Sequence, residues 1–387
     1  MLKEEKAWAD TANSKRMMSL AFSVACVAVC VAALVWAIVM FFRHGKEHKP
    51  DFTEQYWRDV PRKGLHPAVI GRLWRWDRTS TDDLTATIMH LAQTGAVRID
   101  SGSYMAPTKH GGMKTVNDFY ITKMVEVDAI SDPIDKATFE LLFDKVAAGQ
   151  NSLWFGSIRK YGDDHPERLV NAVKHWQDVL TAETDKHGFF EEKGNNLRAW
   201  TWALAVILIA VAMVIWFITD NMLPVICGIP TVLALAFIGN NMTRRSVDGN
   251  NLVAHCKALR NWLRDFSSLE ERPPTDVKVW GEFMVYAYLF GVAKQAIEQL
   301  RKTQPQLFTV DHTYGDTYVP WWGWYTSYET GASAGMPDVG SFLSWSFNQA
   351  VKTAHEAIQA ESSGSGSGGG FSSGGGGGFG GGGGGAR

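Results

Sequence analysis

The sequence predicts an α+β membrane protein with three transmembrane helices and mainly helical cytoplasmic domains, among them a winged-helix-like unit. Three long stretches carry no charged side chain, and the segment after the first has the order helix, strand, turn, strand. The glycine excess belongs to one end, because 16 of the 38 glycines lie in residues 362–387. Such a Gly/Ser tail cannot bury enough surface to offset the entropy of ordering, so we expect it to be disordered.

The overall composition limits the class of protein further. A mean hydropathy of -0.12 with 20% charged residues is too polar for a chain that lies mostly in lipid. The uncharged stretches nevertheless contradict a simple soluble enzyme, and the polar balance contradicts a compact polytopic transporter. The net charge of -2 leaves no basic surplus of the kind that attracts nucleic acid.

Residues 17–42 form the first predicted transmembrane helix. At about 1.5 Å per residue they are long enough to cross about 30 Å of hydrocarbon. Residues 199–219 and 222–243 form the second and third, and the short loop at Asp220 makes them a helical hairpin. Pro224 is tolerated in the first turn of the third helix, where its missing N–H has no helical partner to lose.

Basic side chains near these segments predict their orientation. The hairpin loop has none, whereas its outer ends carry Lys186, Lys193, Arg198, Arg244, Arg245, Lys257 and Arg260. We therefore expect the protein in a bacterial plasma membrane, with residues 43–198 and 244–387 on the cytoplasmic side. Residues 1–16 are expected to form a short extracytoplasmic N-terminus. The cations at Lys3, Lys6, Lys15 and Arg16 oppose this orientation.

Residues 43–198 are expected to form the winged-helix-like α+β domain. Helices are predicted at 67–74 and 81–93, the second with a capping hydroxyl from Thr79, Ser80 or Thr81 at its start. Short strands at 96–99 and 119–121 flank a polar turn at 101–117. Two more helices are expected, one from Ser131 and one over 166–187.

Binding of this domain to DNA is disfavoured. The helix before the wing would enter the major groove, and residues 81–93 contain Asp82 and Asp83 without any Lys or Arg. Phosphate contacts supply most of the affinity for duplex DNA, so an acidic helix opposes binding. A protein-contact or structural module is the favoured interpretation.

Residues 244–361 are expected to form a cytoplasmic helical segment. One helix is predicted over 251–271, and a second from about Thr275 through Ile297. An aromatic-rich stretch follows at 314–328. Its rings are expected to pack on the segment's own helices, to lie at the membrane interface, or to form a groove for a partner or ligand. The candidate contact residues for the membrane interface or a partner are Tyr318, Trp321, Trp322, Trp324 and Tyr325.

No catalytic, cofactor or metal site is predicted. The sequence has no P-loop, no H-E-x-x-H, no nucleophile elbow and no kinase motif set. His44 and His48 are four residues apart but are interpreted as a solvated basic flank of the membrane, and Glu191 and Glu192 as solvated charge. The four cysteines do not have the spacing of a zinc site or a disulfide framework.

Several of these segments together resemble a bacterial family of membrane proteins known as Domain of Unknown Function 2207. They include the apolar hairpin, the aromatic stretch, the Phe-punctuated glycine tail, and three motifs that run from Asp83 to Gly95, from Leu259 to Phe266, and from Val279 to Ala293. The resemblance implies the membrane topology and carries over no catalytic residues. Members usually have a signal peptide and a β-rich extracytoplasmic domain before the first span, so we expect a short variant or missing upstream sequence.

The leading functional hypothesis is a plasma-membrane-anchored, non-enzymatic interaction or signalling scaffold that presents cytoplasmic modules to a protein partner or to another copy of itself. A first alternative is a subunit of an oligomeric transport or channel assembly. A second is a membrane-tethered winged-helix transcription regulator, and an unrecognised enzyme is the remaining one. The three uncharged spans argue against an ion path, because intramembrane ionisable residues usually mark one.

Overall fold

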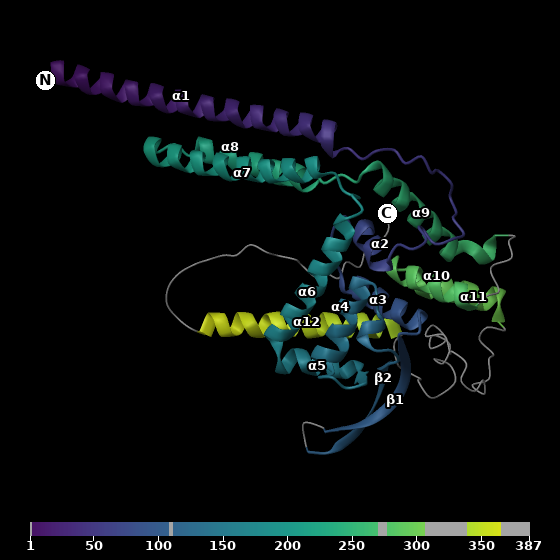
Figure 1. Cartoon of the computed structure of the whole chain (residues 1–387). Coiled ribbons are helices and arrows are strands. Elements are labelled where there is room, and N and C mark those ends of the chain that lie inside the picture. The colour runs from purple at the N-terminus through teal and green to yellow at the C-terminus, as the bar shows by residue number, and fades with distance from the viewer. Residues whose placement is uncertain (1, 108–110, 270–276, 306–338, 365–387) are drawn as a thin grey trace. The chain divides into compact units, whose positions relative to one another are not determined.

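The computed structural model describes residues 2–107, 111–269, 277–305 and 339–364. The chain divides into two compact units, of which unit 1 comprises residues 1–51 and 188–250, and unit 2 the remainder. Figure 1 labels the elements of both units along the chain. The aromatic stretch at 314–328 and most of the predicted glycine tail lie outside the described residues.

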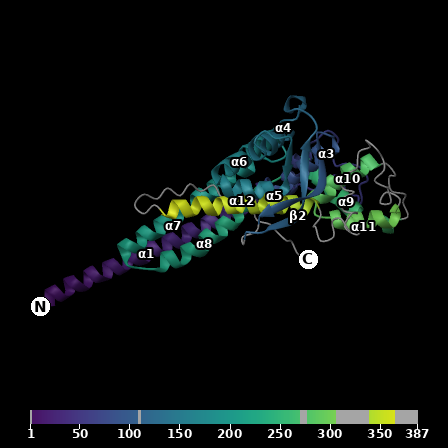
Figure 2. The same cartoon turned by 90° about the horizontal axis from the view of Figure 1, so that it is seen from below.

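Three long helices build unit 1. They are α1 (Leu2–Met40), which continues as a short π-helix (Phe41–Gly45), α7 (Glu192–Thr219) and α8 (Leu223–Asn240). Each holds a segment long and apolar enough to cross a membrane, at Arg16–Gly45, Asn196–Thr219 and Leu223–Asn240. The three predicted apolar helices are confirmed, although the third ends three residues earlier than predicted. Figure 2 shows the three side by side.

Small side chains let the three helices approach one another. Ala33 and Ala37 of α1, Ala205 and Leu208 of α7 and Leu235 of α8 form one buried cluster. Between α7 and α8, Gly228 lies against Ala212 and Gly239 against Thr201. Lipid is as apolar as these side chains, so close van der Waals contact, rather than hydrophobic burial, holds such helices together.

Polar contacts tie the hairpin loop to the first helix. Asp220 ends α7 with a φ of 56°, and the side-chain nitrogen of Asn221 donates to Ser23 Oγ at 3.0 Å and to Ser19 Oγ at 3.2 Å. The Oδ1 atom of Asn221 accepts the Leu223 amide at 3.0 Å, at the first residue of α8. The loop and the beginning of the first span therefore lie at the same end of unit 1.

At the opposite end of unit 1, the chain after α1, the chain before α7 and the chain after α8 meet. We call the cluster that they form the juxtamembrane junction: Glu47, His48, Glu191, Arg244 and Arg245. The chain before α7 pairs with the chain after α8, because the Glu191 amide donates to the Arg244 carbonyl at 3.0 Å and the Ser246 amide to the Phe189 carbonyl at 2.8 Å. An added Cβ at Gly249 would overlap the Phe189 carbonyl, so this pairing also depends on the absence of a side chain there.

Unit 2 begins with two helices and a hairpin. The helices are α2 (Pro67–Trp74) and α3 (Thr81–Gln93), and the antiparallel strands β1 (Val97–Pro107), β2 (Met113–Lys123) and β3 (Ser152–Trp154) form one sheet in that order. The predicted order is confirmed, and the name winged helix stays a prediction. The expected turn at 101–117 was wrong, because most of it continues both strands. Its polar, exposed residues lack the apolar alternation by which a half-buried strand is recognised.

Helix α3 is the centre of this unit, with α2, α4 (Pro133–Phe139), α10 (Val277–Leu289) and α12 (Val339–Gly364) packed around it. Ten of its thirteen residues are buried. It begins with the predicted cap, since the Ser80 hydroxyl accepts the Asp82 amide and the Asp83 carboxylate accepts the Ser80 amide at 2.8 Å. A Cβ added at Gly71 of α2 would overlap the side chain of Asp83. A Cβ added at Gly340 of α12 would overlap the side chains of Met89 and Tyr288.

A second group of elements follows the sheet. A 3-10 turn (Val127–Ala129) precedes α4, which Asp132 caps and which runs into a π-helix (Glu140–Val146); α5 (Phe155–Asp164) and α6 (Pro166–Asp185) follow. Trp176 of α6 is buried among these elements and its ring nitrogen donates to Thr138 Oγ1 at 2.8 Å. The helices predicted from Ser131 and over 166–187 are confirmed, whereas α5 was not predicted.

The last part of unit 2 contains an aromatic core. Helix α9 (Val247–Asp265), with a 3-10 turn (Phe266–Ser268), lies near α10 and α11 (Ala293–Thr303), and Trp262 stacks on Trp280 at 5.9 Å between ring centroids. The single helix predicted through Ile297 was wrong. The chain breaks at Gly291, whose φ of +70° ends α10 in a conformation that glycine adopts without steric cost.

Helix α12 was not predicted as a separate element. It packs along α3, α5 and α6, and Phe342 near its beginning contacts the rings of Phe119 and Phe155. Its polar side chains reach the start of α3, where Ser344 Oγ donates to Asp82 Oδ1 at 3.0 Å and Thr81 Oγ1 to Asn348 Oδ1 at 3.0 Å. Helix α12 therefore packs against the N-terminal end of α3.

Candidate functional site

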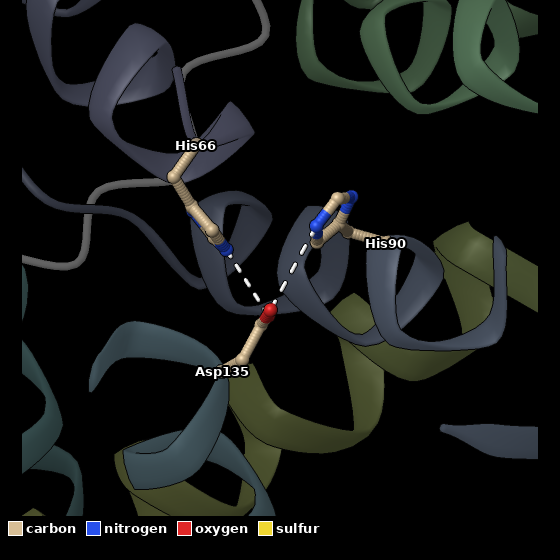
Figure 3. A group of neighbouring side chains, drawn as sticks. All are labelled: His66, His90 and Asp135. Carbon is tan, nitrogen blue, oxygen red and sulfur yellow. Dashed lines mark hydrogen bonds and ion pairs between the residues drawn. The ribbon is translucent and has the colours of Figure 1, made fainter. Parts of the chain in front are cut away.

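Three titratable side chains from three different helices converge in unit 2. His66 precedes α2, His90 lies in the last turn of α3, and Asp135 lies in the first turn of α4 (Figure 3). The Nε2 atom of His66 lies 3.1 Å from Asp135 Oδ1, and the Nε2 atom of His90 lies 3.7 Å from Asp135 Oδ2. We call this group the His-Asp-His cluster.

Local sequence fixes the position of His66. It is the N-cap of α2, and its backbone is extended, as the residue before a proline prefers. Its Nδ1 atom accepts the Ala68 amide at 3.1 Å, so in the neutral ring the proton is on Nε2, which donates to Asp135. Both ring nitrogens are therefore engaged, and the ring is not poised to take a proton from a substrate.

The carboxylate of Asp135 sits at a helix start that favours negative charge. Asp132 caps α4 by accepting the amides of Ile134 at 2.8 Å and Asp135 at 3.1 Å, and Asp135 follows in the first turn. The N-terminal end of the helix dipole stabilises an anion at this position. The cluster thus has one well-supported anion between two imidazole rings.

The surroundings of His90 disfavour its protonated form. Burial lowers its pKa from the ordinary value, and the neighbouring His66 lowers it further, whereas Asp135 and Asp132 act in the opposite direction without reversing the shift. The two rings meet edge to face with centroids 5.2 Å apart. About 30% of the His90 side chain remains exposed, so the cluster opens to solvent on this side.

The donor set of the cluster has a specific chemical capacity. Two imidazole nitrogens and one carboxylate are the ligands that zinc and other borderline divalent cations take in proteins. All three ligand atoms lie within 4.8 Å of one another. The cluster can therefore act as a hydrogen-bonded brace between three helices or as a cation site.

The juxtamembrane junction is a second group of charges, and it pairs residues that the sequence did not connect. His48 Nε2 lies 2.8 Å from Glu191 Oε1, and Arg244 donates to the other oxygen of the same carboxylate. Burial alone would raise the pKa of Glu191, but these two hydrogen bonds and the charges behind them outweigh burial and lower the pKa. His48 and Glu191 are thus partners within unit 1, and both side chains stay partly exposed to solvent, at 34% and 25%.

The predicted contact residues are not placed by the structure. Tyr318, Trp321, Trp322, Trp324 and Tyr325 lie outside the described residues, so their assignment to the membrane interface or to a partner stays a prediction.

The residues of the His-Asp-His cluster were missed at the level of sequence. His66 and Asp135 are 69 positions apart and follow no ligand spacing, and His90 lies within an amphipathic helix. The only local signals were the capping positions of His66 and Asp132, and these indicate helix starts without indicating that the starts meet.

These features together define a multi-pass membrane protein with a large, mostly helical α+β unit. The C-terminal domain of the predicted membrane protein DUF2207 matches residues 53–300, and the chain belongs to this family. The resemblance seen in the sequence is thereby confirmed. No curated protein and no solved structure matches the chain.

Proposed function

We propose that the protein is a non-enzymatic interaction protein, anchored in a bacterial plasma membrane, with unit 2 in the cytoplasm. Contacts inside unit 1 support the arrangement of the spans. The junction joins the chain after α1, before α7 and after α8, so these three segments lie on one side of the bilayer, and the bond from Asn221 to Ser19 lies at the other end. The cations Arg43, Lys46 and Arg244 support a cytoplasmic position for the junction side.

The β1–β2 hairpin is the observation that favours an interaction function. Strand β3 pairs only with Tyr120, Ile121 and Thr122, whereas the pairing of β1 with β2 continues to Pro107 and Met113. Beyond the reach of β3, the hairpin exposes two apolar side chains, Met105 at 56% and Met113 at 60%. A two-stranded ribbon gains little stability by itself, and flexible methionines suit adaptable protein contacts. The hairpin is therefore our proposed contact element.

The burial of α3 argues against the transcription-regulator alternative. In a winged helix that reads DNA, the helix before the wing presents one face to the major groove. Here that helix is enclosed by α2, α4, α10 and α12, and the three residues outside its core are only partly exposed. DNA readout by α3 would require removal of packed helices, so a protein-contact module is the better proposal.

Site-specific crosslinking in the native membrane tests the proposed contact. A photoreactive amino acid replaces Met105 or Met113, and in the matched control it replaces Lys174 on the exposed face of α6. We expect one crosslinked species of discrete mass from both hairpin positions and none from Lys174. Mass spectrometry then distinguishes a second copy of this chain from another protein. Equal labelling from all three positions, or none from the hairpin, contradicts the proposal.

A further inference from the structure

We infer that the His-Asp-His cluster binds one divalent first-row transition ion, with zinc as the reference ion. The inference is independent of the interaction function. It places a metal between the start of α2, the end of α3 and the start of α4, which are otherwise joined there only by side-chain contacts.

The spacing of the ligand atoms fits a tetrahedral ion. With metal–ligand distances of about 2.1 Å, two ligands of a tetrahedron lie about 3.4 Å apart. The Nε2 atom of His66 lies 3.1 Å from Asp135 Oδ1 and the Nε2 atom of His90 lies 3.7 Å from Asp135 Oδ2, so both separations are close to that value, although they involve different oxygens of the carboxylate. All three ligand atoms lie within 4.8 Å of one another, so rotation of the carboxylate together with a small approach of the two rings places the three donors around one ion.

Two hydrogen bonds of His66 must be exchanged for the metal bond, the one that Nε2 donates to Asp135 and the one that Nδ1 accepts from Ala68. The Nε2 atom of His66 carries the proton in the neutral ring, so this proton moves to Nδ1 through solvent when Nε2 binds the ion. The Ala68 amide then loses its acceptor. The bonds from the three donors to the ion must outweigh the loss of these hydrogen bonds, and the binding experiment below measures the net result.

The surroundings provide both a counter-charge and an entry path. Asp135 supplies one negative charge at the ion, and Asp132, one turn earlier, supplies a second nearby. The open side of His90 gives the ion access from solvent. Three protein ligands leave a fourth position for water or for a ligand from a partner, which is the arrangement of zinc sites that keep one position open.

Metal titration of the full-length protein tests the inference. The untagged chain in detergent or nanodiscs is stripped with a chelator, and Zn²⁺ binding is followed by calorimetry and by metal content after dialysis. We expect one Zn²⁺ per chain, and with Co²⁺ a visible absorption typical of a four-coordinate site. His90→Gln is expected to weaken binding by more than the 10-fold to 100-fold that second-shell changes cause.

Matched variants separate the cluster from adventitious sites. His175→Gln on α6 and His355→Gln on α12 remove exposed histidines that lie outside the cluster, and they are expected to bind Zn²⁺ as the wild type does. Asp135→Asn serves as a second cluster variant, and the metal-free unfolding midpoint shows whether each variant folds. The inference is overturned if the wild type binds no stoichiometric ion, or if folded His90→Gln binds as tightly as His175→Gln.

Discussion

At the level of single residues, the buried charges of unit 2 are arranged in supported groups. Asp83 has no exposed surface and accepts both the Arg75 guanidinium and the Ser80 amide. Arg72 is paired with Asp77 at 2.6 Å, across a turn in which Trp76 and Asp77 both have positive φ. A buried charge without a partner is strongly destabilising, so each of these groups depends on the presence of every member.

The state of His90 makes local stability depend on pH. Because burial lowers its pKa, the unfolded chain binds a proton at His90 in a pH window where the folded chain does not. The contribution of His90 to the free energy of unfolding is therefore fully present above about pH 6.5, the ordinary pKa of histidine. It is lost as the pH falls from there to the lower pKa of His90 in the folded chain. The loss is at most about 1.4 kcal/mol per pH unit.

Chelator-treated protein should show this dependence in its unfolding midpoint between pH 7.5 and about pH 5. The variant His90→Gln keeps a polar side chain that does not titrate in this range, so its midpoint should fall less over the same interval. The exposed variant His175→Gln should retain the full slope. If the wild type and His90→Gln have parallel profiles, His90 is not the group responsible.

At the level of elements, unit 2 depends on close helix contacts at glycines. The Cβ that alanine would add at Gly71 of α2 overlaps the Asp83 carboxylate, and Asp83 cannot withdraw without breaking its bonds to Arg75 and Ser80. Helix propensity alone acts in the opposite direction, because alanine is about 1 kcal/mol better than glycine within a helix. Whether Gly71→Ala destabilises or stabilises the two helices therefore shows whether Gly71 lies against Asp83.

We expect Gly71→Ala to destabilise α2 and α3 by about 1–3 kcal/mol, which is the usual cost of overpacking. Hydrogen exchange of the amides of the two helices in the full-length protein measures this as a loss of protection. Asn171→Ala on the exposed face of α6 is the control and should change protection by less than about 0.5 kcal/mol. Increased protection in Gly71→Ala would show that α2 and α3 do not approach each other this closely.

At the level of the whole molecule, contacts inside unit 1 support the proposed membrane topology. The loop at Asp220 lies at the end of unit 1 opposite the junction, and the beginning of the first span lies beside that loop. The proposed orientation therefore places the loop outside and the junction in the cytoplasm, together with the C-terminus.

Reporter fusions test this orientation. Alkaline phosphatase inserted after Asp220 should be active, because the enzyme folds only outside the cytoplasm, and a fluorescent protein at the C-terminus should mature in the cytoplasm. The reciprocal fusions, with the reporters exchanged, should both be silent. Activity of phosphatase at the C-terminus would reverse the proposed orientation of all three spans.

The sequence by itself determined the elements that depend on neighbouring residues. Three spans follow from the absence of charge over a membrane thickness, and the starts of α3 and α4 follow from Ser80 and Asp132, which hydrogen-bond within one turn. The hairpin extension and the break at Gly291 were missed, because an exposed strand has no apolar alternation and a glycine within a helical pattern does not show its φ.

Only the tertiary structure decided which of these elements meet. His66, His90 and Asp135 converge from three helices, and His48, Glu191 and Arg244 from the ends of three spans. The enclosure of α3, which adds to the acidic character of that helix as an argument against DNA binding, likewise depends on α10 and α12, far along the chain. The physical reason is that such contacts are set by packing between segments distant in sequence, and no local pattern of residue types records that packing.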